Sequence, residues 1–304
     1  MESTYAKIIK EICLEEGFEL SCFSADWIFV IKKEGKSRNI LAFQFDLNTA
    51  AVQAICKDKC AASDVLSHYG IPCVEHLFFT NPLSGYLPKS GNYKYLHELL
   101  AKHQKLVCKP NAGASGTNVF PVADSGELER AMAKIFKSAD SMAVSPYHEI
   151  EKEFRLIVLD GKVKLAFSKE IPFVKGDGRS TLAELMSKSG IAALPADMGD
   201  ISLSTVLEVD EIWKYGWKHN LAHGAVPQVV NDEALISELS KLALRASEAL
   251  NIKFASIDII RSADSYKILE INGGVMMEHF ASASPENYTK AKAIYKEAIY
   301  LMFA

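Results

Sequence analysis

The sequence is predicted to fold as an α+β protein, and three observations lead to this prediction. An Asp160-Gly161 pair between two apolar runs is a strong signal for a two-residue β-hairpin. The runs 256–260 and 267–272 indicate a second hairpin near the end of the chain. A long helical pattern, Asp232–Leu250, lies between the hairpins, and another begins at Ser284, a good capping residue. Hairpins interleaved with helices are typical of an antiparallel α+β architecture.

The first residues are predicted to form a small α/β cap. An amphipathic helix is expected near Tyr5–Glu16, followed by strands near Trp27–Lys32 and Ile40–Phe45. We assign residues 1–55 to this cap.

Two further units are predicted after the cap, over residues 56–145 and 146–304. A helix from about Asp58 ends at Gly70, because glycine is favoured just past a helix C-terminus. The elements expected after it are strand Val74–Phe79, helix Tyr93–His103, strand Lys105–Lys109, a helix opening at Asp124, strand Ala143–Val144, strands Glu153–Leu159 and Lys162–Ser168 around the first hairpin, and a helix near Leu182–Lys188.

Composition excludes several classes of protein. A net charge of −4 gives no electrostatic reason to expect nucleic acid as a partner. No run is long and apolar enough to cross a membrane, and the N-terminal residues lack the pattern of a signal peptide. None of the six cysteines forms a C-x-x-C pair, so we expect reduced thiols rather than a metal site. These features predict a cytoplasmic globular protein with neither a nucleic-acid nor a membrane partner.

A candidate phosphate-binding loop follows the strand that ends at Lys109. Its small residues are Gly113, Ala114, Ser115 and Gly116, which let the backbone approach a polyphosphate so that N–H groups can cradle it. Lys109 would supply a point charge on the phosphates. The loop lacks the Gly-Lys-Ser/Thr ending and the following helix of a P-loop. An ordinary turn is the alternative interpretation.

A candidate metal site lies on the second hairpin. Asp258 is on its first strand, and Glu270 and Asn272 are on its second. Oxygen ligands of this kind suit Mg²⁺, which takes one or two carboxylates together with phosphate oxygens. The alternative is that these side chains are solvated hairpin ends. Between the loop and this hairpin, the connector from Ser145 to Glu153 could offer backbone groups to an adenine edge, although such a run is also typical of a polar loop.

The order of these segments resembles the ATP-grasp superfamily, whose fold consists of two α+β subdomains that grip ATP. The resemblance runs from about Ala50 to the end of the chain. It is strongest to the cyanophycin synthetase and glutathione synthetase group, and its most distinctive segment is the Gly-Asp-Gly-Arg-Ser-Thr run that begins at Gly176, followed by Asn220-Leu221-Ala222-His223-Gly224. The chain would then be an ATP-grasp fold with a short N-terminal α/β cap.

The resemblance implies a role for individual residues. It implies contacts with ATP for Lys59, Lys109, Gly113, Ala114, Ser115, Gly116, Pro146, His148, Glu153 and Lys169. It implies two Mg²⁺ ions, with Mn²⁺ as an alternative, bound by Asp258, Glu270 and Asn272. It also implies catalytic roles for Lys218, Asn220 and Arg155 in stabilising charge near the γ-phosphate.

The sequence departs from the family pattern at three places. Ser145 stands where a Glu or Gln is common, and Ser256 stands where D-Ala–D-Ala ligases have an Arg. After Asn272, Gly273-Gly274-Val275-Met276-Met277 replaces the usual Ser/Thr-Pro-Gly. We interpret His219 and His223 as hydrogen-bonding residues, and Met276 as pocket wall or core. The acceptor substrate cannot be read from these positions.

The function implied by the resemblance is ATP-dependent ligation of a carboxylate to an amine through an acyl phosphate, with release of ADP and phosphate. The implied substrates are an amino acid or a short peptide. A kinase acting on a small molecule and a non-catalytic nucleotide-binding module remain alternatives. Because the cap is short, the acceptor site is either open or completed by a second subunit, and we expect a homodimer.

Overall fold

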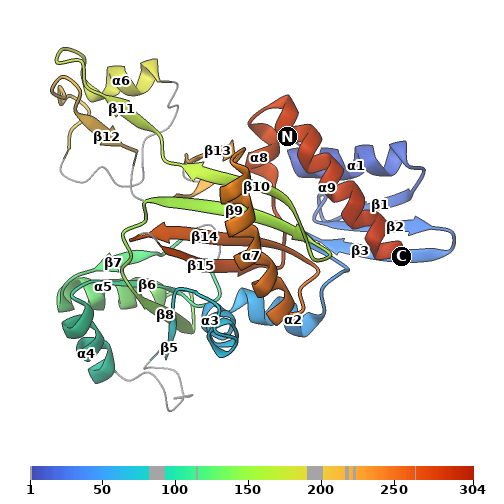
Figure 1. Ribbon diagram of the computed structural model, residues 1–304, viewed down its shortest axis with the longest axis horizontal. Coiled ribbons are helices and arrows are strands. Elements are labelled where there is room, and N and C mark those ends of the chain that lie inside the picture. Colours follow the sequence, from blue (N-terminus) through green and yellow to red (C-terminus); the bar gives the residue numbers. More distant parts are fainter. Residues whose placement is uncertain are drawn as a thin grey trace.

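The computed structural model describes residues 2–81, 93–113, 116–189, 201–215, 219–221, 224–263 and 265–304. Its centre is a five-stranded antiparallel sheet with the order β13-β10-β9-β14-β15 (Figure 1). These strands are β9 (Lys152–Leu159), β10 (Lys162–Glu170), β13 (Val226–Val229), β14 (Phe254–Ser262) and β15 (Ser265–Asn272). The α+β prediction is therefore confirmed, as are both predicted hairpins, since β9 pairs with β10 and β14 pairs with β15.

The central sheet is covered on both faces, and successive side chains of β9 pack alternately into the cores on its two faces. Leu156 and Val158 pack with the core beneath helix α7 (Glu233–Ala249). Ile157 and Leu159 point to the opposite face and join the core beneath α8 (Glu278–Ser282) and α9 (Pro285–Phe303). Because successive side chains of a strand point to opposite faces, the polar residues Glu153 and Arg155 lie on the same face as Ile157.

A second antiparallel sheet has the order β5-β8-β6-β7 and its own core. Its strands are β5 (Leu77–Thr80), β6 (Leu106–Pro110), β7 (Phe120–Val122) and β8 (Ser141–Pro146). Helices α4 (Tyr93–His103) and α5 (Ser125–Ile135) lie on this sheet (Figure 1). Leu96, Leu100 and Leu128 pack with Cys108 and Val144 in that core.

The N-terminal cap consists of helix α1 and a small antiparallel sheet. Its elements are α1 (Thr4–Glu15), β1 (Glu19–Phe23), β2 (Ile28–Lys33), β3 (Lys36–Leu41) and β4 (Gln44–Phe45). The cap shares one core with α8, α9 and the central sheet, in which Tyr5 and Phe45 pack near Tyr295. Glu278 of α8 accepts the backbone N–H groups of Thr4 and Tyr5 at 2.8 and 2.6 Å, satisfying donors in the first turn of α1.

The structure differs from the prediction in the cap and just after it. The strand β1 was not expected, and four of its five residues are exposed. The single helix predicted from about Asp58 is preceded by another, since α2 (Ala50–Lys57) and α3 (Lys59–His68) meet at Asp58. Asp58 has extended backbone with ψ of 110°, and its carboxylate caps α3 by accepting from Ala61 N.

The distinctive Gly-Asp-Gly-Arg-Ser-Thr run has a structural role here. It lies in a small unit formed by β11 (Phe173–Lys175), β12 (Ile212–Lys214) and α6 (Leu182–Lys188). The carboxylate of Asp177 accepts hydrogen bonds from Arg179 N, Ser180 N and Ser180 Oγ at 2.6 to 2.9 Å. A Cβ on Gly176 would lie 2.0 Å from the carbonyl oxygen of Glu208, so only glycine fits there.

Two sequence expectations concern the whole chain. Within the described ranges, no helix is long and apolar enough to cross a membrane. All six cysteines are free thiols, of which Cys22 is exposed. The division of the chain at residues 55 and 145 remains a prediction, although the shared core shows that the cap is not packed as a separate body.

Candidate active site

A cavity of about 560 Å³ lies between the two large sheets and reaches the cap. Every predicted site residue that the structure describes lines it: Lys59, Lys109, Gly113, Gly116, Pro146, His148, Glu153, Arg155, Lys169, Asn220, Asp258, Glu270 and Asn272. Ala114, Ser115 and Lys218 lie outside the described residues, as does His223. Residues from widely separated segments of the chain thus meet in one cavity.

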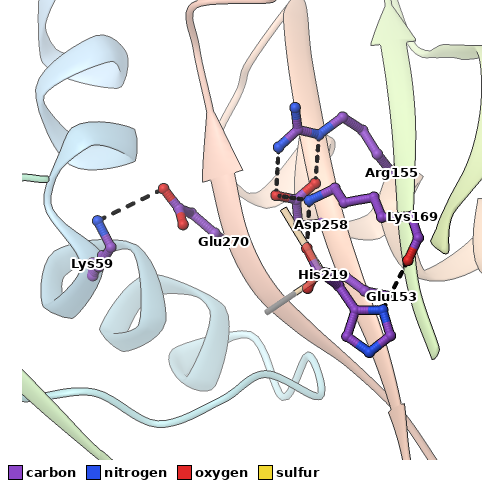
Figure 2. Close-up of polar contacts among 7 residues, drawn as sticks. All are labelled: Lys59, Glu153, Arg155, Lys169, His219, Asp258 and Glu270. Carbon is purple, nitrogen blue, oxygen red and sulfur yellow. Dashed lines mark hydrogen bonds and ion pairs between the residues drawn. The ribbon is translucent and has the colours of Figure 1, made fainter. Parts of the chain in front are cut away.

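Four charged side chains form a cluster on the central sheet, in which Glu153, Lys169 and Asp258 are buried and Arg155 is partly buried (Figure 2). Arg155 on β9 lies opposite Asp258 on β14, and its Nε and Nη2 atoms donate to the two carboxylate oxygens at 2.7 Å each. Lys169 on β10 lies 2.9 Å from Asp258 Oδ2 and also donates to Glu153 on β9. The two carboxylates and the two cations therefore neutralise one another, and charges removed from water require such partners.

The cluster shifts the pKa values of its members in opposite directions. Burial alone would raise the pKa of Asp258, but the charges of Arg155 and Lys169 outweigh it and hold the pKa well below its ordinary value. Burial raises the pKa of Glu153, and Lys169 only partly offsets that effect. The pKa of Arg155 is raised because Asp258 outweighs the effect of burial. Asp258 is thus the firmly ionised acid of the cluster.

Lys109 is the buried cation of the second sheet. It lies on β6, and its side chain enters the cavity near the start of the candidate phosphate loop. Burial, with a further contribution from Lys59, lowers the pKa of Lys109 to about 8, although Glu270 opposes the shift. A bound anion would stabilise the protonated form, so the site is suited to a phosphate group.

Lys59 connects the loop to the second hairpin. It is the first residue of α3 and is buried, and its Nζ donates to the carbonyl oxygen of Gly113 at 2.7 Å. The same Nζ lies 3.7 Å from Glu270 Oε1 (Figure 2). The buried Asn111 holds the loop entrance on the same helix end, because its side chain bonds both Cys60 N and Asp58. The loop entrance is therefore held next to Glu270.

The register of β14 and β15 places the predicted metal ligands on one face. Asp258 pairs with Glu270, and Ser256 pairs with Asn272, so all four residues face the cavity. Both oxygens of Asp258 accept hydrogen bonds from Arg155, whereas the contact of Glu270 with Lys59 Nζ is longer, at 3.7 Å, and Asn272 lines the cavity beside it. In the described part of the chain, no three His, Cys, Asp or Glu side chains gather as a metal site. Glu270 and Asn272 fit one Mg²⁺ ion that would keep phosphate or water oxygens as further ligands.

The connector between the two sheets forms another wall of the cavity. Pro146, Tyr147 and His148 line it, and Tyr147 N donates to Lys105 O at 3.0 Å. The Lys105 Nζ atom lies 3.8 Å from the centroid of the Tyr147 ring. Burial lowers the pKa of His148, so its imidazole is neutral at pH 7. The backbone of this connector can present hydrogen-bonding groups to a planar ring in the cavity.

Several lining residues were not predicted as site residues. Trp27, Ala42 and Phe43 come from the cap, and Leu221 and His279 from later segments. In the sequence, Trp27 and Phe43 are distinguished only as aromatic residues next to turns. Such residues are too common to identify a site. His219, expected to form hydrogen bonds, is within 2.8 Å of the carbonyl oxygen of Lys169 (Figure 2), and Met276 lines the cavity as expected.

Comparison with known proteins gives one domain match and two curated relatives. Residues 212–293 match the RimK-like ATP-grasp domain. The glutathione biosynthesis bifunctional protein GshAB of Lactiplantibacillus plantarum is 22% identical over 156 residues, which are 49% of this chain and 19% of that protein. Tetrahydromethanopterin:alpha-L-glutamate ligase of Methanocaldococcus jannaschii is 39% identical over 56 residues, 18% of each chain. The matched segments thus span about a fifth of these curated relatives.

Solved structures show the same fold over most of the chain. A bifunctional glutathione synthetase from Pasteurella multocida superposes with a TM-score of 0.58 at 15% identity, covering 97% of this chain and 43% of that one. D-Alanine–D-alanine ligase from Bacillus anthracis gives a TM-score of 0.53 at 18% identity, covering 83% of this chain and 67% of that one. The predicted ATP-grasp fold is confirmed by these superpositions.

Proposed function

We propose that this chain, which has the ATP-grasp fold and matches the RimK-like ATP-grasp domain over residues 212–293, is an ATP-dependent ligase that joins a carboxylate to an amine. The observation that carries this proposal is that three cations, Lys109, Arg155 and Lys169, line the same cavity as the acid Glu270. Phosphoryl transfer depends on alignment and on neutralising charge, and these side chains supply both.

In the proposed reaction, an oxygen of the substrate carboxylate attacks the γ-phosphorus of ATP. The bond from that phosphorus to the β–γ bridging oxygen breaks, and ADP leaves. The amine then attacks the acyl carbon, phosphate leaves with its oxygen, and the amine loses a proton. The products are ADP, phosphate and an amide. Amino acids or short peptides are the proposed substrates.

Each described side chain has a proposed part in this reaction. Lys109 and the residues Gly113 to Gly116 are proposed to hold the phosphates, and Pro146 and His148 to contact adenine through the backbone. Arg155 and Lys169 offset the charge that develops on the transferred group, and Asn220 orients it. Lys59 and Glu153 also line the cavity, with Glu153 proposed to hold the ribose. Lys218 is proposed as a further cation.

Mg²⁺, when bound, would neutralise phosphate charge, and Glu270 and Asn272 would hold it. The binding of a second ion by Asp258 remains a prediction, because Arg155 now occupies both of its oxygens. Mn²⁺ is the alternative ion, and a homodimer remains an expectation.

The test is product identity. The protein is incubated with ATP, Mg²⁺ and pooled amino acids and short peptides, and ADP, phosphate and product masses are followed together. Equal ADP and phosphate, with a product one water lighter than its two parents, supports the ligase. ADP without phosphate, with a phosphorylated product, would identify a kinase instead. Nucleotide binding with no product from any substrate would favour a non-catalytic binding module. The Glu270→Ala variant serves as the inactive control.

A further inference from the structure

The end of the cavity that lies against the cap differs in chemistry from the rest. Trp27, Ala42 and Phe43 line it from the cap, together with Leu221 and Met276. Among the described lining residues, every Lys, Arg, Asp and Glu comes from α3, β6, β9, β10, β14 or β15, and none comes from the cap. The cap therefore contributes only uncharged side chains to the cavity, and we call the end that Trp27, Ala42 and Phe43 line the apolar end.

The apolar end lies next to the predicted metal ligands. The carbonyl oxygen of Phe43 accepts Val275 N at 3.0 Å. A Cβ built on Gly274 would lie 3.7 Å from the Cβ of Phe43, so the two backbones are in close contact two residues beyond Asn272. A substrate group that reaches Asn272 is therefore within reach of Phe43.

The apolar wall is rigidly supported from behind. The Phe43 ring packs edge-to-face on Tyr5 with centroids 4.9 Å apart, and Tyr5 packs in the same way on Tyr295 at 5.2 Å. The Tyr295 hydroxyl donates to Val275 O and accepts from Met277 N, each at 2.9 Å. These contacts fix the segment after Asn272 against the cap, so the wall is preformed.

The turns that carry the aromatic residues have strained backbones. Ser24, Ala25 and Asp26, just before Trp27, have φ of 54°, 53° and 64°, and Ala42, just before Phe43, has φ of 54°. None of them is glycine, so each costs on the order of 1–2 kcal/mol. These residues lie in the tight turns between β1 and β2 and between β3 and β4, which place Trp27 and Phe43 at one end of the cap's sheet.

Trp27 remains 53% exposed although its ring lies edge-on to Phe43, with centroids 6.1 Å apart. An exposed indole beside a preformed apolar wall offers a large contact area to a ligand. Taking the ligase function above as its basis, we propose that Trp27, Phe43 and Met276 form the specificity pocket for an apolar, preferably aromatic, side chain of the substrate amino acid or peptide.

The experiment compares substrates that differ only in the side chain: glycine, alanine, leucine, phenylalanine, glutamate and lysine, free and in dipeptides. We expect the wild type to prefer leucine and phenylalanine. Trp27→Ala should lower kcat/KM for these two by at least about tenfold, and should leave glycine and alanine within about twofold. Met276→Ala should act in the same direction. A preference of the wild type for glutamate or lysine would overturn the proposal.

Phe23→Ala is the matched control. Phe23 lies on the same small sheet and is also 53% exposed, but it does not line the cavity. It should leave the whole substrate series unchanged. An equal loss in Phe23→Ala and Trp27→Ala would show a general effect on the cap and would contradict the specific pocket.

The pocket can be tested even if no amide forms. Calorimetry then measures binding of phenylalanine-containing and glycine-containing peptides to the MgATP-loaded protein. Tighter binding of the aromatic peptide, lost in Trp27→Ala, would support the pocket although the ligase proposal had failed. Equal binding of the two peptides, or no binding of either, would overturn the pocket as well.

Discussion

Arg155 donates two parallel hydrogen bonds, each of 2.7 Å, to the carboxylate of Asp258, which lies directly opposite on the neighbouring strand. Paired in this way, Asp258 satisfies two cations, because Lys169 also lies 2.9 Å from it. Asp258 and Glu270, both predicted as metal ligands, are therefore in different electrostatic environments, and the two substitutions should have different effects.

Asp258→Asn should lower the free energy of unfolding by about 3–5 kcal/mol, because it leaves buried cations without their partner. Glu270→Gln should change it by about 1 kcal/mol or less, since Glu270 is only partly buried and lies 3.7 Å from Lys59. Urea unfolding monitored by circular dichroism measures both. Activity should be lost in both variants, so activity does not distinguish them. Equal losses in the free energy of unfolding would contradict the difference in electrostatic environment between Asp258 and Glu270.

The pKa of Lys109 predicts how nucleotide binding depends on pH. In the ligand-free protein this pKa is lowered to about 8, so the side chain loses its positive charge as pH rises through that value. A bound phosphate favours the charged form, so the affinity for ADP should weaken above pH 8, by up to tenfold per pH unit. Titration calorimetry between pH 7 and pH 9.5 measures this. Lys109→Arg, which stays charged, should abolish the dependence.

Lys59→Met should weaken ATP binding by about tenfold or more. The substitution removes the hydrogen bond that holds the Gly113 carbonyl, together with the charge beside Glu270. Equilibrium dialysis with labelled ATP measures the effect. Lys57→Met makes the same chemical change at an exposed position two residues earlier and should have no effect. If the two variants bound ATP with equal affinity, the contacts of Lys59 with Gly113 and Glu270 would not contribute to ATP binding.

Gly273→Ala should destabilise the protein by about 1–3 kcal/mol through overpacking. Its new Cβ would lie 2.2 Å from Gln53 Oε1, the far end of a side chain that otherwise donates to the Gly273 carbonyl at 3.1 Å. Combining it with Gln53→Ala should recover part of the loss. A double-mutant cycle of unfolding midpoints measures this coupling, and strict additivity would show that the two residues act separately.

The sequence predicted those parts of the fold that depend on local chemistry. Asp160 and Gly161 have φ of 47° and 68°, which is why an Asp-Gly pair identified the hairpin. The runs 256–260 and 267–272 likewise identified the second hairpin, with Asp258 on its first strand and Glu270 on its second. These features are fixed by neighbouring residues.

The rest depends on contacts between distant segments. The Arg155–Asp258 pair joins residues 103 positions apart, and its register is set by the burial of whole strands. Phe43 meets Val275 because of the shared core, and nothing near Phe43 in the sequence indicates it. The pairing of β11 with β12 across the small unit was unexpected for the same reason.

The shared core of the cap, α8, α9 and the central sheet has a consequence for local opening of the protein. Elements that bury one core tend to open together, so amide protons of β2 and β3 should exchange with solvent about as slowly as those of β9 and β14. The sheet β5–β8, with its separate core, forms a second cooperative unit. Segments of the most protected unit would then surround the apolar end of the cavity, whereas Lys109 on β6 belongs to a sheet that can open independently.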